Sequence, residues 1–200
     1  MFKLTGTGIS EEWDSCRPLW SLNSALPISM TVFEIVPEGD SRDIMIDDRR
    51  CRSDDEKRKL KLNLYFTGEA LGVGWQPPPF FSLYPKKPLP DVKLPGVNSG
   101  ALAVTARAFD VLDMFLEMAG ELFPVRFAGV DLTFCNITEC VDCIDESESQ
   151  WADLPSGRRI WKRVQFDFTL LPESTLFKIP QWPTSIYCWE RHKDQEGEFK

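Results

Sequence analysis

The chain has 200 residues, of which 42% are hydrophobic and 12% aromatic, and its net charge is -8 at pH 7. This composition supports a hydrophobic core and argues against disorder for most of the chain, and the length suits one domain with two lobes, residues 1–97 and 98–200. Because phosphate contacts need clustered Lys and Arg, the acidic balance argues against a nucleic-acid partner and favours a basic protein partner.

The N-terminal lobe is predicted to be irregular and β-rich. Residues 1–29 are rich in Ser, Gly and Pro and are expected to form an irregular arm. Apolar, β-branched side chains predict a strand over Met30–Val36 and a short one over Ile44–Ile46. No stretch here has the apolar length of a signal peptide or a membrane span, so we expect a cytoplasmic chain without membrane contact.

The next segment is highly charged and then becomes rich in proline. Residues 47–61 mix both charge signs and are expected to form a solvated surface, and the alternating leucines of residues 60–65 predict a strand. Proline and glycine then recur throughout residues 68–100, which predicts a connector of loops and short edge strands between the lobes.

A helix is predicted over Thr105–Ala119. Thr105 is a good N-cap residue, Gly120 stands where a helix often ends in a residue of positive φ, and apolar residues recur between them at helical spacing. Pro124 prevents a return to helix. The alternating apolar residues on either side of Ala128 and Gly129 then predict a β-hairpin, on which the helix is expected to pack.

Two further strands, with a short apolar segment between them, are predicted towards the end of the chain. Trp161–Leu170 alternates apolar and polar residues and predicts a long strand with one buried face. Leu176–Ile179 is a short apolar segment, and Ser185–Trp189 predicts a last strand. The predicted fold class is therefore α+β, a mixed and mainly antiparallel sheet with one principal helix, about residues 105–119, packed on strands that include the hairpin and Trp161–Leu170.

Negative charge is concentrated in one part of the sequence. Between Phe127 and Gly157 there is no Lys or Arg, whereas seven carboxylates occur: Asp131, Glu139, Asp142, Asp145, Glu146, Glu148 and Asp153. Trp151 and Trp161 lie nearby and are of the residue type that anchors protein interfaces. The segment is either a solvated acidic loop or a docking surface for a basic partner.

The same region resembles a known family. The helix, the segment Glu121–Val125, the strand end Phe134–Thr138 and the segment Val141–Ser149 follow one another as in the C-terminal half of the eleventh immunity-protein family of bacterial polymorphic toxin systems. Further matches at residues 171–173 and 176–180 extend the resemblance over roughly residues 98–190. The resemblance implies a stoichiometric inhibitor that binds the toxin encoded beside it. The chain departs from the family at its end, where His192–Phe199 replace a longer helical segment.

Catalytic and metal motifs are weak by comparison. Cys135, Cys140 and Cys143 form a C-x4-C-x2-C run without a fourth zinc ligand, and we interpret them as reduced, buried apolar residues. Asp142 and Asp145 are three residues apart, which leaves a weak divalent-cation site as an alternative. The single histidine stands between Arg and Lys near the terminus, where a surface position is expected. No cofactor is implied.

We therefore predict a non-enzymatic immunity protein that inhibits a basic toxin by occlusion. The predicted partner-binding residues are Asp142, Asp145, Glu146, Glu148, Trp151 and Asp153. Two alternatives stay open: an effector-loading chaperone or adaptor, and an enzyme with an unrecognised carboxylate and cysteine site. The oligomeric state is also open, because an exposed edge strand could pair two copies.

Overall fold

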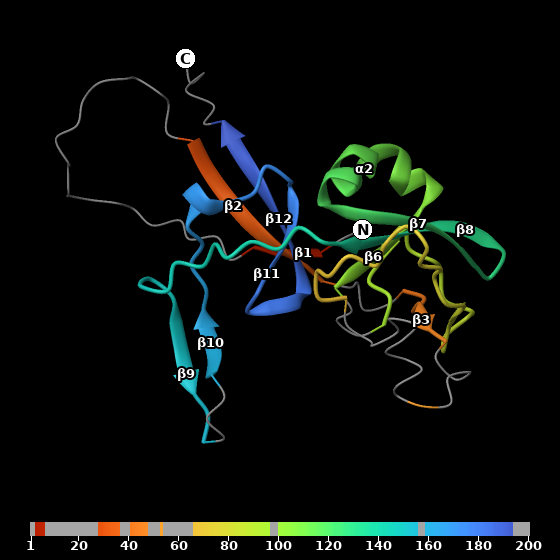
Figure 1. The fold of residues 1–200 in the computed structure, drawn as a ribbon, viewed down its shortest axis with the longest axis horizontal. Helices are drawn as coiled ribbons and strands as arrows, with labels where there is room; N and C mark the ends of the chain where they lie inside the picture. Colours follow the sequence, from red (N-terminus) through yellow and green to blue (C-terminus); the bar gives the residue numbers. More distant parts are fainter. Residues whose placement is uncertain are drawn as a thin grey trace, which may run out of the picture.

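The computed structural model describes residues 3–6, 28–36, 41–47, 53, 66–96, 100–155 and 159–193. These residues form two four-stranded antiparallel sheets and one α-helix (Figure 1), which confirms the predicted α+β class. The strand predicted at residues 60–65, most of the charged segment 47–61 and most of the arm before Met30 lie outside the described residues.

The first sheet joins the two ends of the chain. Its strands are β1 (Lys3–Gly6), β2 (Ile28–Val36), β12 (Trp182–Lys193) and β11 (Leu176–Ile179), in that order. The strands predicted at Met30–Val36 and Ser185–Trp189 are confirmed, although β12 is longer than expected, and the short apolar segment Leu176–Ile179 forms β11. Residues 3–6 form a strand, so the prediction of an irregular arm was wrong there.

The second sheet carries the helix. Its strands are β5 (Val92–Lys93), β6 (Ala101–Thr105), β8 (Val130–Ile137) and β7 (Gly120–Phe127), in that order. The helix α2 (Ala106–Ala119) takes the chain from β6 to β7, past the strand β8 that lies between them (Figure 1). The first four residues of β6, Ala101–Val104, are apolar and fully buried, because both faces of the strand are covered there.

The ends of α2 follow the sequence closely. The Thr105 side chain accepts a hydrogen bond from the Ala108 backbone N–H at the N-terminus, and the Gly120 backbone N–H donates to the Leu116 carbonyl at the C-terminus. Gly120 has φ 176°, which is extended backbone, so the expected positive φ is wrong. Its small size matters instead, because a Cβ atom there would lie 1.9 Å from the Asn136 carbonyl oxygen.

The predicted hairpin is β7–β8. Its strands pair from Gly120 with Ile137 to Phe127 with Val130, and the two-residue turn has φ 51° at Ala128 and 84° at Gly129. Two consecutive positive φ values are the turn geometry that matches the twist of a tight hairpin. Glycine suits the second position, whereas alanine is strained at the first.

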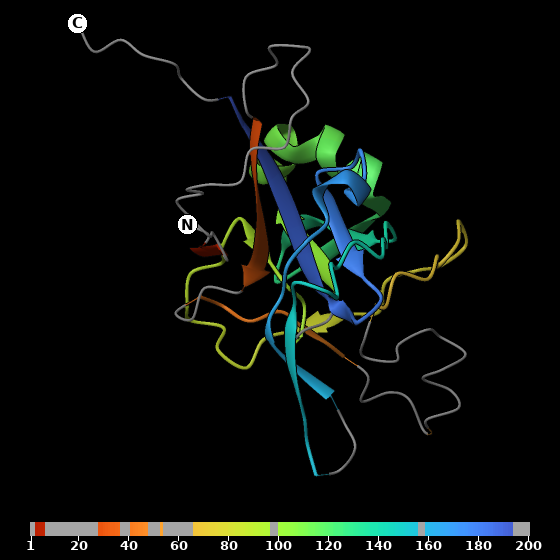
Figure 2. The ribbon, with the colours of Figure 1, turned by 90° about the vertical axis from the view of Figure 1, so that its left-hand side faces the viewer.

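The remaining elements are small. β3 (Met45–Ile46) pairs with β4 (Phe80–Phe81) inside the proline-rich connector, and β9 (Gln150–Asp153) pairs with β10 (Arg159–Arg163). The β9–β10 hairpin projects from the body in both ribbon views (Figures 1 and 2).

The long strand predicted over Trp161–Leu170 is wrong beyond Arg163, and so is its predicted contact with the helix. The strand β10 ends at Arg163, after a register irregularity, and Phe168–Leu170 form a short 3-10 helix. The Asp167 carboxylate accepts hydrogen bonds from the Thr169 N–H at 2.9 Å and the Thr169 hydroxyl at 2.6 Å. This local capping outweighs strand pairing, so Phe168 and Leu170 are exposed. The helix packs on β6, β7, β8 and β11 instead.

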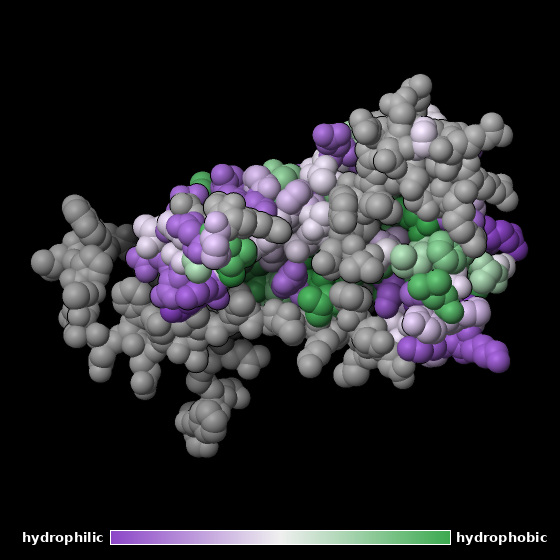
Figure 3. Space-filling view, turned by 90° about the horizontal axis from the view of Figure 1, so that it is seen from below, coloured by the Kyte–Doolittle hydropathy of each residue, from purple (hydrophilic) through white to green (hydrophobic). Residues whose placement is uncertain are grey.

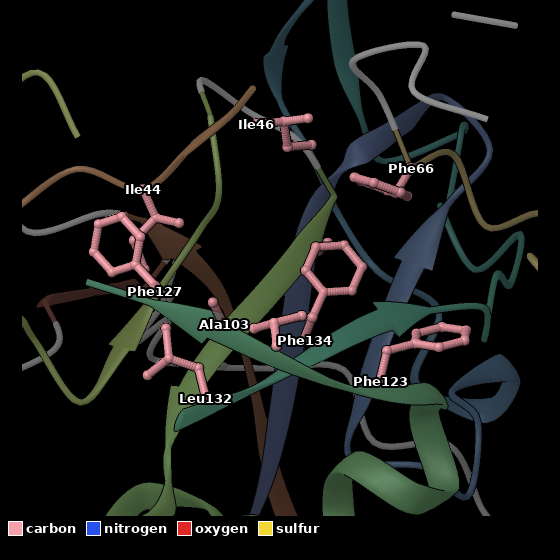
Figure 4. Packing of buried hydrophobic residues seen from close by; sticks show 10 residues of the cluster. Ile44, Ile46, Phe66, Ala103, Phe123, Phe127, Leu132 and Phe134 are labelled. Carbon is pink, nitrogen blue, oxygen red and sulfur yellow. The ribbon is translucent and has the colours of Figure 1, made fainter. Parts of the chain in front are cut away.

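Three cores lie in successive layers. The first covers the face of β7 and β8 opposite α2, where Phe134 packs at the centre with Ile44, Phe66 and Phe123 (Figure 4). The second lies between α2 and both sheets and includes Leu102, Leu116, Ile137, Leu176 and Ile186. The third lies on the other face of the first sheet, towards the acidic segment, and includes Val32, Cys143, Ile144, Phe177, Ile179 and Tyr187.

Candidate partner-binding site

The acidic segment forms a tight turn built around Asp145. The Asp145 carboxylate accepts hydrogen bonds from the Ser147 N–H at 2.9 Å, the Ser147 hydroxyl at 2.6 Å and the Glu148 N–H at 3.2 Å. These bonds, the Ser147 hydroxyl first, lower the pKa of Asp145 below its ordinary value. Asp145 therefore shapes the turn, while Glu146 and Glu148 stand exposed on its surface.

Backbone hydrogen bonds fix this turn to the body. Asp145 N–H donates to the Gln165 carbonyl at 2.9 Å, and Asp167 N–H donates to the Cys143 carbonyl at 2.8 Å. Ser149 adds its hydroxyl, which accepts from the Gln165 N–H at 2.8 Å. Cys143, between the acidic residues, is fully buried in the third core. Hydrogen bonds and a buried side chain thus hold the turn against the body of the protein.

Asp142 begins the acidic turn and has a side-chain partner. Its carboxylate accepts a 2.8 Å hydrogen bond from the Gln181 amide. The neighbouring backbone is tied to β11, because Val141 N–H donates to the Lys178 carbonyl at 2.9 Å and Lys178 N–H donates to the Glu139 carbonyl at 2.8 Å. Asp142 is exposed, as is Glu146.

Tryptophan side chains stack beside the acidic turn. Trp151 and Trp161 meet edge to face with ring centroids 5.2 Å apart, and Trp161 meets Trp182 at 6.0 Å. Trp151 and Trp161 face each other across the β9–β10 ladder, which is why two residues ten positions apart come into contact. Trp182, at the start of β12, also contacts Trp161, and no sequence pattern predicted this contact.

A cleft opens next to these rings. It has a volume of about 320 Å³ and is lined by residues of β2, β10 and β12 and by the segment after β10, including Glu34, Trp161, Lys162, Arg163, Trp182 and Tyr187. Its charged groups are of both signs. The strand β10, on one side of this cleft, is basic, whereas residues 142–148 carry four carboxylates and no basic side chain.

The structure brings together most of the predicted site residues. Asp142, Asp145, Glu146 and Glu148 share one turn, and Trp151 follows at the start of β9, half-buried against Trp161. Asp153 lies at the other end of β9, which runs away from the turn at about 3.3 Å per residue. Seen from below, hydrophilic residues gather at the end of the molecule where the β9–β10 hairpin lies (Figure 3).

The three cysteines of the C-x4-C-x2-C run lie in different environments. Cys135 packs beneath α2 in the second core and Cys143 packs in the third, both fully buried as expected, whereas Cys140 is exposed and departs from that expectation. Burial raises the pKa of Cys135 to about 12 and that of Cys143 to about 11. Within the described ranges, no three His, Cys, Asp or Glu side chains are placed to share a metal ion.

Sequence reasoning missed a buried lysine. Lys178 lies in the middle of β11, is 0% exposed, and donates from Nζ to the Phe66 carbonyl at 2.5 Å. Burial lowers its pKa to about 8. The signal was present in the sequence, since Lys178 stands between Phe177 and Ile179 in a strand whose every residue is buried.

A second polar cluster holds the loop that follows Phe66. Glu121 accepts from the Leu71 N–H at 2.6 Å and the Gly72 N–H at 2.8 Å, and it accepts a further bond from the Asn136 amide at 3.0 Å. The same amide donates to the Glu69 carbonyl at 3.0 Å. Lys178, Asn136 and Glu121 thus anchor successive peptide groups of one loop, which is a structural role.

Comparison with known proteins identifies no family: neither a family model nor a curated protein matches the chain. In the part of the chain that the structure describes, no helix combines the length and the apolar character needed to cross a bilayer.

Proposed function

We propose that this chain is an immunity protein, which binds a cognate toxin and inhibits it by stoichiometric occlusion. The observation that carries the proposal is the hydrogen-bonded acidic turn, in which the Asp145 carboxylate accepts bonds from the turn itself while Glu146 and Glu148 face solvent. The resemblance of residues 98–190 to the immunity-protein family supports the same reading. In this proposal the protein acts in the cytoplasm as a binding partner and carries out no catalysis.

The geometry of the turn suits fast recognition of a basic surface. Backbone bonds and two buried side chains, Cys143 and Ile144, hold the turn before binding, so little conformational entropy is lost when a partner docks. Exposed carboxylates attract a basic partner over a distance of about one Debye length and accelerate encounter. The half-buried Trp151 and Trp161 offer apolar area beside this charge.

The test uses the full chain and the product of the adjacent reading frame. The variant Glu146→Gln/Glu148→Gln removes two exposed charges and leaves the Asp145 bonds intact. We expect its association rate at low salt to fall roughly tenfold and to lose most of its salt dependence, because electrostatic steering is reduced. Stopped-flow measurements at several salt concentrations give both quantities.

The matched control removes two exposed carboxylates elsewhere. Glu69→Gln/Asp131→Asn has the same net charge as the test variant, and Asp131 makes only an exposed ion pair with Arg126. It is expected to associate like the wild-type protein. Equal effects of the two double variants would remove the acidic turn from the mechanism. A neighbouring gene product that is harmless when expressed alone would remove the immunity function itself.

A further inference from the structure

A second surface is found on the outer side of α2. Four apolar side chains recur there at positions i, i+3, i+4 and i+7: Val111 is 73% exposed, Met114 61%, Phe115 37% and Met118 51%. This spacing places them along one stripe of the helix. The helix already uses Leu112, Leu116 and Ala119 to contact the sheets, so the exposed stripe is additional to its core face.

The charge beside the stripe is negative. The charged residues of α2 are Arg107, Asp110, Asp113 and Glu117, and Arg107 is engaged in an ion pair with Asp91. The three acidic residues recur at i, i+3 and i+7 and so form a row along the helix next to the apolar stripe. The last turn contains no basic residue, and the negative end of the helix dipole adds to this field.

We propose that this outer face of α2 docks a cationic amphipathic helix of a partner protein. An apolar stripe in such a helix would cover Val111, Met114 and Met118, and Lys or Arg residues along its edge would pair with Asp110, Asp113 and Glu117. The two methionines suit this role, because their unbranched side chains adapt to the partner surface. The inference is independent of the proposed function, since it involves none of the residues of the acidic turn.

Charge disfavours a second copy of the chain as the occupant. Two copies facing each other across this stripe would each bring three carboxylates to the contact, and the one arginine of each helix is engaged by Asp91. Like charges brought together in this way oppose association. A cationic helix instead neutralises the row.

The probe is a synthetic 18-residue peptide of leucine and lysine with leucine at helical spacing. Its counterparts are the same sequence with glutamate for lysine and a scrambled peptide of identical composition. The full chain is expected to bind the leucine-lysine helix at one to one, and to bind both counterparts at least about tenfold more weakly, because each lacks either the cations or the stripe. Isothermal titration calorimetry measures the affinities.

Surface variants locate the binding. Val111→Ser/Met118→Ser should weaken peptide binding at least about tenfold, whereas the matched control Val73→Ser/Leu83→Ser, which alters exposed apolar residues outside the helix, should leave it unchanged. Glu146→Gln/Glu148→Gln should also bind normally, which separates this result from any failure of the proposed function.

Methyl NMR provides a readout that needs no variant. On titration with the peptide, the Met114 and Met118 methyl signals should shift while that of Met45 in β3 stays in place. Unchanged affinity in Val111→Ser/Met118→Ser, or equal binding of the glutamate peptide, would overturn the proposal. So would a dimer in sedimentation analysis that Val111→Ser/Met118→Ser dissociates, because the face would then be covered by a second copy.

Discussion

Lys178 is a buried charged residue that the sequence analysis missed, because its neighbours in the strand are apolar. The sequence predicted Leu176–Ile179 only as a short apolar segment, and the structure shows it as the strand β11 with all four residues buried. The Lys178 ammonium has the Phe66 carbonyl as its hydrogen-bond acceptor, and burial lowers its pKa to about 8. A cation held in such a place opposes folding whenever it is charged, because its lost hydration is only partly replaced.

This burial predicts a pH dependence of stability. The pKa of Lys178 falls from 10.5 in the unfolded chain to about 8 in the folded one, so between these values the unfolded chain binds a proton that the folded chain does not. Stability therefore rises with pH in that window. Relative to Lys178→Met, the wild-type protein should gain roughly 1 kcal/mol in free energy of unfolding between pH 7 and pH 9.

Urea unfolding of both proteins at the two pH values gives this difference. Cys135 and Cys143 have raised pKa values and lower the stability above about pH 9, as their unfolded thiols ionise, but both proteins keep them. Lys162→Met removes an exposed ammonium and controls for the loss of charge itself. Parallel pH profiles for the wild-type protein and Lys178→Met would show that the lysine is not buried in solution.

At the scale of elements, sequence patterns correctly predicted the helix and the hairpin, which are formed by interactions between residues close together in the chain. The helix α2, its Thr105 cap and the β7–β8 hairpin follow from periodicity and from the residues at their ends. The end of β10 could not be predicted in this way, because apolar alternation continues to Leu170 while the Asp167 side chain turns the backbone. The acidic turn was found from composition alone, but the internal role of Asp145 depends on three hydrogen bonds that sequence does not reveal.

The junction of α2 and β7 depends on the absence of a side chain. Because a Cβ atom at Gly120 would overlap the backbone of Asn136, Gly120→Ala should cost roughly 3 kcal/mol or more or prevent folding. Gly74→Ala is the matched control, since nothing lies within 4 Å of its Cβ position, and it should change stability by less than about 0.5 kcal/mol. The urea unfolding midpoints of the two variants measure these effects. Similar midpoints would contradict the close packing of Gly120 against the Asn136 backbone.

At the scale of the molecule, each sheet draws strands from both predicted lobes. β2 pairs with β12 over seven residue pairs, and β5 pairs with β6. Sequence patterns predicted β2 and the middle of β12 but not β6, and they did not predict which strands pair, since pairing between distant segments leaves no local periodicity. The division into two lobes, residues 1–97 and 98–200, stays a prediction. Because strands of one lobe pair with strands of the other, the division can be tested by separating the two fragments.

Separate expression of the two lobes is the direct experiment. Because each fragment would lack partner strands for both sheets, neither residues 1–97 nor residues 98–200 should show dispersed NMR signals alone. Mixing the two at equal amounts should restore a dispersed spectrum, since the missing pairings can then form between chains. A folded isolated fragment would instead indicate two independent domains.

The pairing of β2 with β12 also affects how the protein matures during synthesis. Phe33 is paired with Cys188, which leaves the ribosome more than 150 residues later. At typical elongation speeds this gap lasts roughly ten to thirty seconds. Throughout that interval the edge of β2 that later pairs with β12 has no partner strand, which is a hazard for aggregation. Nascent chains of this protein should therefore depend on holdase chaperones until translation is nearly finished.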